Sequence, residues 1–79
     1  MPLGRPRRFE LTLSSAERTE LTAWAQSRAL PHGLVERAHA ILLSADELAN
    51  TEVAVRVGLS HPMVGHWRRR FHADRLAGL

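Results

Sequence analysis

The stretch that decides the fold is residues 50–70, NTEVAVRVGLSHPMVGHWRRR. Its first eight residues place Val53 and Val57 on one face of a short helix. Asn50 has a side-chain oxygen that can cap the free amides of the first turn. Gly58 can adopt a positive φ without steric cost, which allows a sharp turn. The stretch therefore predicts a helix that Asn50 opens and Gly58 ends.

A second helix is predicted directly after this turn. Ser60 is a suitable N-cap, and a proline two residues later is tolerated because first-turn amides have no intrahelical partner. Val64, Trp67 and Phe71 recur at spacings of three and four, so they are expected to face inward. The residues expected to face outward, and to enter a DNA major groove, are Ser60, His61, Met63, Gly65 and His66. The pattern predicts a helix-turn-helix; a helical hairpin that binds no nucleic acid is the alternative.

Composition limits the class of protein. A chain of 79 residues is one domain, near the lower size at which a single core suffices. The absence of cysteine excludes disulfides, cysteine-ligated zinc and thiol catalysis. No apolar run approaches the roughly 20 residues that span a bilayer, and the basic N-terminus lacks the apolar core of a signal peptide. We expect a cytoplasmic, nucleoid-associated protein with no membrane partner.

Charge is distributed unevenly along the chain. The net charge is +3: residues 1–8 carry three arginines, residues 9–55 have a net charge of −4 and residues 56–79 a net charge of +4. All eleven basic residues are arginine, which suits bidentate contacts to phosphate or guanine, although a coding bias towards arginine explains the composition equally well. The five histidines lack metal-site spacing, so neither a metal nor another cofactor is expected.

The first eight residues, MPLGRPRR, are predicted to form a flexible basic arm, because two prolines and a glycine oppose helix and strand. Residues 4–7 resemble the Gly-Arg-Pro core with which extended arms lie in A·T-rich minor grooves. Arg5, Arg7 and Arg8 are therefore candidate DNA contacts. The alternative is a disordered tail that adds only non-specific attraction.

The segment between the arm and the decisive stretch is expected to be helical after an extended lead at residues 9–13. Ser14 and Glu17 form a capping-box pattern, which predicts a helix from about Ser15 to Ala29. Pro31 and Gly33 indicate a chain reversal, and a very apolar helix from about Leu34 to Leu48 is expected at the centre of the bundle.

The end of the chain carries two leucines, Leu76 and Leu79, that can pack back on the bundle. Trp24, Trp67 and Phe71 are expected in the core rather than stacked on bases. The expected fold class is all-α, a small three- to four-helix bundle of the homeodomain-like type. Residues 9–79 are expected to form a single DNA-binding domain with the helix-turn-helix at 50–71.

Several stretches, taken in order, carry a resemblance to a known family. They are LTLS at 11–14, ER at 17–18, VERA at 35–38, ILL at 41–43, NTEV at 50–53, VGLS at 57–60, Val64, WRRRF at 67–71 and LAGL at 76–79. Together they resemble the N-terminal DNA-binding domain of bacterial insertion-sequence transposases of the IS630 type, which are related to the Tc1/mariner group. The resemblance implies binding to the terminal inverted repeats of the element, with DNA cutting and joining left to a separate catalytic domain.

The resemblance also implies that this chain is not itself an enzyme. The family's catalytic domain uses an acidic metal-binding triad, whereas Asp46 and Asp74 are the only aspartates here. The family often has basic residues at the positions of His61 and Gly65. Base contacts are therefore expected to be fewer here, or a different sequence is read.

Arg68, Arg69 and Arg70 are candidate phosphate contacts. Because they span about 200° of a helix, they cannot all touch one groove wall. Favourable placement of cations at a helix C-terminus is their other explanation. The expected partner is double-stranded DNA, with no small-molecule substrate, and binding as a monomer or as a homodimer stays open. A stand-alone transcriptional regulator and a helical protein-interaction module are the alternative functions.

Overall fold

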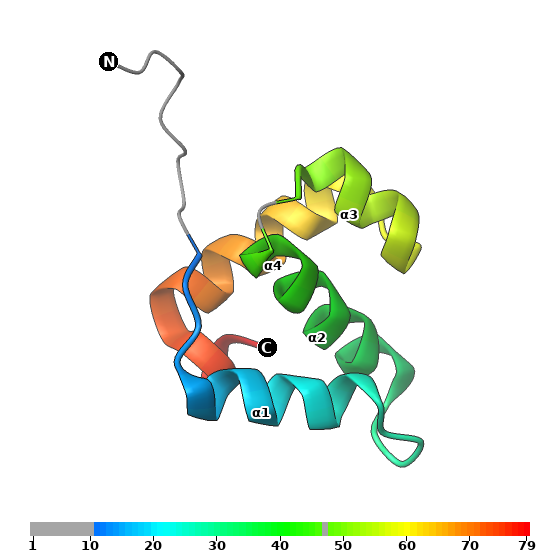
Figure 1. Cartoon of the computed structure of the whole chain (residues 1–79). Coiled ribbons are helices and arrows are strands. Elements are labelled where there is room, and N and C mark those ends of the chain that lie inside the picture. Colours follow the sequence, from blue (N-terminus) through cyan, green and yellow to red (C-terminus); the bar gives the residue numbers. More distant parts are fainter. Residues whose placement is uncertain (1–10, 47) are drawn as a thin grey trace, which may run out of the picture.

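The computed structural model describes residues 11–46 and 48–79. This part of the chain contains only helices, with no strand (Figure 1). The elements are α1 (Ser15–Ala25), α2 (His32–Ala45), α3 (Asn50–Val57), α4 (His61–Asp74) and a short 3-10 helix, η1 (Arg75–Gly78). The predicted all-α bundle is confirmed. The predicted basic arm at residues 1–8, and residues 9 and 10 of the lead, lie outside the described residues.

Helix α2 is the central element, as its apolar sequence predicted. It packs against α1, α3 and α4. Two groups of buried side chains surround it. The first group, called the lower core, has as its buried members Leu11, Leu21, Ala38, Ile41 and Phe71. The second group, called the upper core, has as its buried members Ala40, Val53, Ala54 and Val64. Helices α2 and α4 contribute to both cores and so join the two halves of the domain.

Helix α1 begins with the predicted capping box. The Ser14 hydroxyl accepts a hydrogen bond from the Glu17 amide, and the Glu17 carboxylate accepts one from the Ser14 amide, both at 3.0 Å. The helix ends at Ala25, before the predicted Ala29. The reason is local: the hydroxyl of Ser27 accepts from the Ala29 amide at 3.0 Å, and such a bond competes with continuation of the helix.

Helix α2 begins at His32, two residues before the predicted Leu34. The carbonyl oxygen of Pro31 accepts from the Leu34 amide at 3.0 Å, so the proline lies just outside the first turn. Gly33 is consequently inside the helix, and the chain reverses before it. The helix also ends earlier than predicted, and Leu48 packs against the upper core instead.

The turn between α3 and α4 has the predicted chemistry. Gly58 lies in the left-handed region at φ 87° and ψ 25°, and its amide donates to the Ala54 carbonyl at 2.8 Å. Ser60 follows as the N-cap of α4, and its hydroxyl accepts from the Met63 amide at 3.3 Å. The helix-turn-helix predicted from residues 50–70 is therefore present.

Substituting Gly58 with alanine is expected to lower the free energy of unfolding by about 1 kcal/mol, because an L-residue is disfavoured at this φ. An added Cβ meets no atom within 4 Å, so the backbone conformation alone sets the loss. Urea denaturation measures it. Gly58→Asn is the matched control and should lose less, since asparagine tolerates the left-handed region. Equal stability of Gly58→Ala and the unmodified chain would contradict the turn geometry.

The prediction that Asn50 caps α3 is wrong. Ala49 occupies the N-cap position, and its carbonyl accepts from the Val53 amide at 3.0 Å, so the helix begins one residue earlier than expected. Asn50 is the first helical residue, and its side chain turns towards α4, where Oδ1 accepts from Arg68 at 2.6 Å. Asn50 therefore links the two helices of the motif rather than capping one of them.

The two ends of the described chain both pack on the lower core. Leu11 is buried in an extended lead, and Leu76 and Leu79 pack against the same cluster after η1, as predicted for the C-terminal leucines. Trp24 and Trp67 also border the cluster, and Phe71 is fully buried within it. Their predicted core role is confirmed. The lead and η1 thus support the C-terminal half of α4.

Candidate nucleic-acid interface

The outward face of α4 follows from its buried face. Val64 and Phe71 are fully buried, and successive helical residues are about 100° apart. That spacing places His66 and Arg69 on the side opposite to the buried pair, and Arg69 is exposed. The helix therefore presents a surface that the domain's own packing leaves open.

The N-terminal part of this surface carries three of the predicted contact residues. His61 and Ser60 are exposed, and the Ser60 hydroxyl is already used to cap the helix. Met63 is 39% exposed. A polarizable side chain in this position can cover a thymine methyl group. Contact of these residues with DNA stays a prediction.

Gly65 and His66, which were also predicted to face outward, are half-buried rather than exposed. The imidazole of His66 packs edge-on against Trp67, with ring centroids 4.7 Å apart. A Cβ on Gly65 would lie 3.4 Å from Asn50 Nδ2 and 3.5 Å from Arg69 Nη1. Gly65 therefore faces the beginning of α3 rather than open solvent. A methyl group at this position would make ordinary van der Waals contacts with both side chains.

The three consecutive arginines have three different environments, as their angular spacing requires. Arg68 is half-buried and donates to Asn50 at 2.6 Å. Arg70 donates through Nε to the Gly78 carbonyl at 2.9 Å, and its guanidinium lies 5.9 Å from the centre of the Trp67 ring. Arg69 and Arg70 are both exposed, but Arg69 has no hydrogen bond to another described residue that would hold its side chain inward. The sequence alone gave all three arginines the same predicted role. It could not separate them, because the partner of Arg68 comes from α3 and the partner of Arg70 from η1.

The structural role of Arg37 was not predicted from the sequence. The guanidinium of Arg37, on α2, lies 4.2 Å from the centre of the Trp67 ring and donates to the Leu79 carbonyl at 3.1 Å. A cation over an indole face is a favourable contact. Arg37 therefore holds the end of the described chain against α4. No local sequence pattern indicates this role, because Trp67 and Leu79 lie 30 and 42 residues further along the chain.

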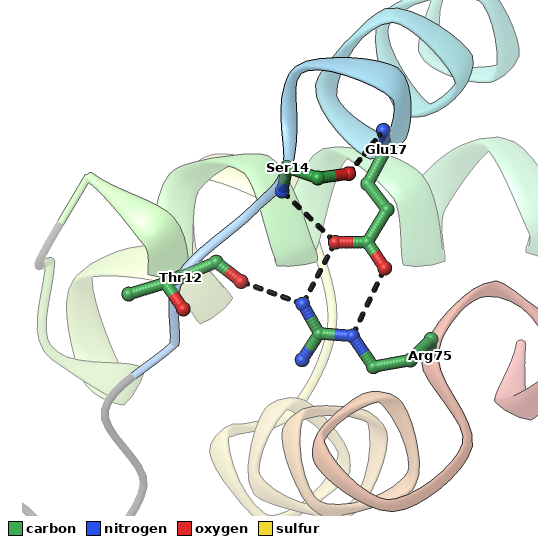
Figure 2. Close-up of polar contacts among 4 residues, drawn as sticks. All are labelled: Thr12, Ser14, Glu17 and Arg75. Carbon is green, nitrogen blue, oxygen red and sulfur yellow. Dashed lines mark hydrogen bonds and ion pairs between the residues drawn. The ribbon is translucent and has the colours of Figure 1, made fainter.

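Arg75, which directly follows α4, forms a tight ion pair with Glu17 in the first turn of α1 (Figure 2). Arg75 donates to both carboxylate oxygens, at 2.9 Å through Nε and 2.7 Å through Nη2. The hydrogen bonds from Arg75 and then from the Ser14 amide lower the pKa of Glu17 to about 2. The same bond to Glu17 raises the pKa of Arg75. The Glu17 carboxylate thus accepts hydrogen bonds both from the Ser14 amide of the helix cap and from Arg75.

This ion pair predicts an acid-sensitive part of the stability. Because the folded-state pKa of Glu17 is depressed from 4.5 to about 2, the contribution is fully present above pH 4.5 and is lost as the pH falls towards 2. Arg75 is 41% exposed, so solvent screening limits the effect, and we expect about 1–2 kcal/mol. Urea denaturation at pH 6 and pH 3 measures it. Glu17→Gln should remove most of the difference; an unchanged difference in that variant would contradict the assignment.

Two kinds of feature are absent from the described chain. No group of three His, Asp or Glu residues in residues 11–46 and 48–79 is arranged to hold a metal ion. Within the same residues, no helix has the length and apolarity required to cross a membrane.

Comparison with known families supports the motif. A family model described as a homeodomain-like domain matches residues 32–79. The chain belongs to this family. The matched residues contain α2, α3, α4 and η1, so the homeodomain-like domain comprises the central helix and both helices of the motif. Helix α1 and the lead lie outside the match. Searches of curated proteins and of solved structures gave no match.

Proposed function

We propose that this homeodomain-like domain binds duplex DNA, with α4 in the major groove. The observation that carries the proposal is that His61, Met63 and Arg69 of α4 are exposed, while Val64 and Phe71 of the same helix are fully buried. Helix-turn-helix domains contact base edges from the N-terminal part of this second helix. Ser60, His61, Met63 and His66 are the proposed contacts in that part, and Arg69 is the proposed phosphate contact.

The finer proposal is that the DNA is the terminal inverted repeat of an insertion sequence of the IS630 type. It is supported by the ordered resemblance of roughly residues 9–79 to the DNA-binding domain of those transposases. In this proposal the chain binds DNA without cutting it, and cleavage belongs to a separate catalytic domain. The protein would then act in the cytoplasm on nucleoid DNA.

A single module of this kind offers limited selectivity, because it buries only about 600–1,000 Å² of protein surface on DNA. We therefore propose that Arg5, Arg7 and Arg8 add minor-groove or phosphate contacts next to the site of α4. Pairing of two chains on DNA is a second way to lengthen the site.

Selection of bound duplexes from a random pool tests the proposal. One enriched motif, found in inverted orientation at the two ends of an insertion sequence, is the expected result. Paired half-sites about one DNA turn apart, located upstream of genes, would favour a transcriptional regulator instead. No enrichment and no salt-dependent binding would reject DNA binding and favour a protein-interaction module.

Arg69→Ala is expected to weaken binding to every duplex to a similar extent. If Arg69 contacts a phosphate, the slope of log K against log salt concentration should fall by about one. Fluorescence anisotropy over a series of salt concentrations measures the slope. Arg28→Ala is the matched control, because Arg28 is an exposed arginine in the loop after α1. A slope unchanged in Arg69→Ala, or reduced equally in both variants, would remove Arg69 from the contacts.

A further inference from the structure

The side of α4 that faces α3 has a gap at Gly65. This glycine is half-buried. Apart from its chain neighbours and the backbone of α4, two side chains of the described residues come within 4 Å of a Cβ placed there, those of Asn50 and Arg69. Both contacts would be ordinary ones, and alanine is the better residue inside a helix. The packing of the described residues therefore gives no reason for a missing side chain at this position.

The amide of Asn50 presents a hydrogen-bond donor to this gap. A guanidinium only donates hydrogen bonds, so the Asn50 atom that Arg68 contacts at 2.6 Å is the oxygen Oδ1. The amide nitrogen Nδ2 is then the atom that borders the gap, 3.4 Å from the Cβ position of Gly65. The bond from Arg68 thus fixes the orientation of the amide, with its donor towards Gly65.

The second group at the gap is also a donor. Arg69 lies one turn after Gly65 on the same side of α4, and its Nη1 is 3.5 Å from the same Cβ position. No carboxylate of the described residues comes within 4 Å of that position. The acidic residue in the first turn of α3, Glu52, accepts a hydrogen bond from Arg56 at 3.0 Å. Two donors, one of them charged, therefore border a single point, an arrangement that suits an anion.

The size of the gap suits a single oxygen atom. An oxygen at the Cβ position would lie 3.4 Å from Asn50 Nδ2 and 3.5 Å from Arg69 Nη1. Small rotations of these two side chains bring it to the length of about 2.9 Å that is typical of such hydrogen bonds. In the proposed function α4 lies in the major groove, so phosphates of the groove wall are the anions that come near its sides. A non-bridging phosphate oxygen therefore fits the gap in charge and in size.

We propose that Asn50, Gly65 and Arg69 form a binding site for one phosphate of the DNA backbone. The Asn50 amide and the Arg69 guanidinium donate to one non-bridging oxygen, which occupies the space where Gly65 has no side chain. Arg68 is a positioning residue, because it holds the Asn50 amide in the required orientation. This inference rests on the proposed function and adds Asn50 to the DNA contacts. The site belongs to both helices of the motif, so the phosphate fixes α3 and α4 together on the DNA.

Replacement of single phosphates by neutral methylphosphonates tests the proposal. Each phosphate of the selected duplex is replaced in turn, and affinity is measured by fluorescence anisotropy for the unmodified chain, Gly65→Ala and Asn50→Ala. Gly65→Ala should unfold at the same temperature as the unmodified chain or higher, as circular dichroism verifies, because alanine favours the helix. Gly33→Ala is the matched control, the same chemical change on α2 with an ordinary contact.

The expected result is coupling at one phosphate. Its replacement should weaken binding of the unmodified chain about tenfold, as the loss of charge-assisted hydrogen bonds implies. Gly65→Ala should weaken binding to the natural duplex about fivefold, and to the duplex with that replacement less than about 1.5-fold. Asn50→Ala should show the same dependence at the same phosphate, and Gly33→Ala should bind both duplexes as the unmodified chain does.

A second substitution of Asn50 separates the donor from the contact with Arg68. Asn50→Asp keeps an oxygen that accepts from Arg68 but replaces the donor at the gap by a charged oxygen. It should weaken binding to the natural duplex at least as much as Asn50→Ala does, and it is used if Asn50→Ala does not fold. Full binding by Asn50→Asp would mean that Asn50 acts only through the fold.

Three further outcomes overturn this inference while leaving DNA binding intact. They are full binding by Gly65→Ala, equal losses of that variant on every duplex, and coupling of Gly65→Ala and Asn50→Ala to different phosphates. Failure of the unmodified chain to bind any duplex overturns the proposed function, and this inference with it.

Discussion

Replacing Phe71 with alanine is expected to leave most of the chain unfolded at room temperature. Phe71 is fully buried in the lower core, where side chains of α1, α2 and α4 meet. Truncation of a buried phenylalanine costs about 3–5 kcal/mol, which equals the whole net stability expected for a domain of this size. The far-UV circular dichroism signal and its urea dependence measure the loss.

Val55→Ala is the control for that experiment. Val55 is 83% exposed on α3, so its truncation should change the free energy of unfolding by less than about 0.5 kcal/mol. A cooperative transition of Phe71→Ala within about 1 kcal/mol of the unmodified chain would mean that the lower core does not hold the domain together.

Gly78→Ala is expected to lower the free energy of unfolding by about 1–3 kcal/mol, because the added methyl group has no space. Its Cβ would collide with the Arg70 carbonyl oxygen and lie 2.9 Å from the Arg70 carbonyl carbon. Both are backbone atoms of α4 and cannot rotate away, so η1 must move. That movement also weakens the hydrogen bond from Arg70 to the Gly78 carbonyl. Thermal unfolding followed by circular dichroism measures the effect.

Gly33→Ala is the matched control, the same chemical change in the first turn of α2. The nearest heavy atom to its added Cβ is 3.6 Å away, an ordinary contact with Arg37. Alanine is the better helix former, so this variant should gain about 0.5–1 kcal/mol. Equal effects of the two substitutions would show that η1 does not pack against α4 as described.

The parts of the fold that depend on local chemistry could be predicted from the sequence. Ser14 with Glu17, Gly58 and Ser60 each act within four residues of their own position, and the structure confirms all of them. The apolar periodicity also identified α2 as the central helix. These features are readable because a cap or a turn is decided by neighbouring residues.

The features that could not be predicted depend on contacts distant in sequence. Asn50 has the chemistry of a cap, yet Arg68, 18 residues away, is its partner. Arg75 and Glu17 are separated by 58 residues. Nothing in the local pattern distinguishes an arginine that will hold the fold from one that will face solvent. Only the assembled bundle separates Arg69, on the open side of α4, from its two neighbours.

The arrangement has a consequence for how the domain meets DNA. Three arginines of α4 and its C-terminal end form hydrogen bonds inside the molecule: Arg68 with Asn50, Arg70 with the Gly78 carbonyl and Arg75 with Glu17. The basic charge of residues 56–79 is therefore only partly available to phosphate. If the domain binds DNA as proposed, selectivity is expected to come from the side chains at the beginning of α4 and from the basic residues before Leu11.

Base replacement in the selected duplex tests the central claim, that the open face of α4 reads the major groove. Replacing guanine by 7-deazaguanine removes the N7 acceptor, and replacing thymine by uracil removes the methyl group, both from the major groove alone. The account predicts a loss of about tenfold or more in affinity at one or more positions within a short block of the site. Unchanged affinity at every such position, with sensitivity only to minor-groove replacements such as inosine for guanine, would contradict it.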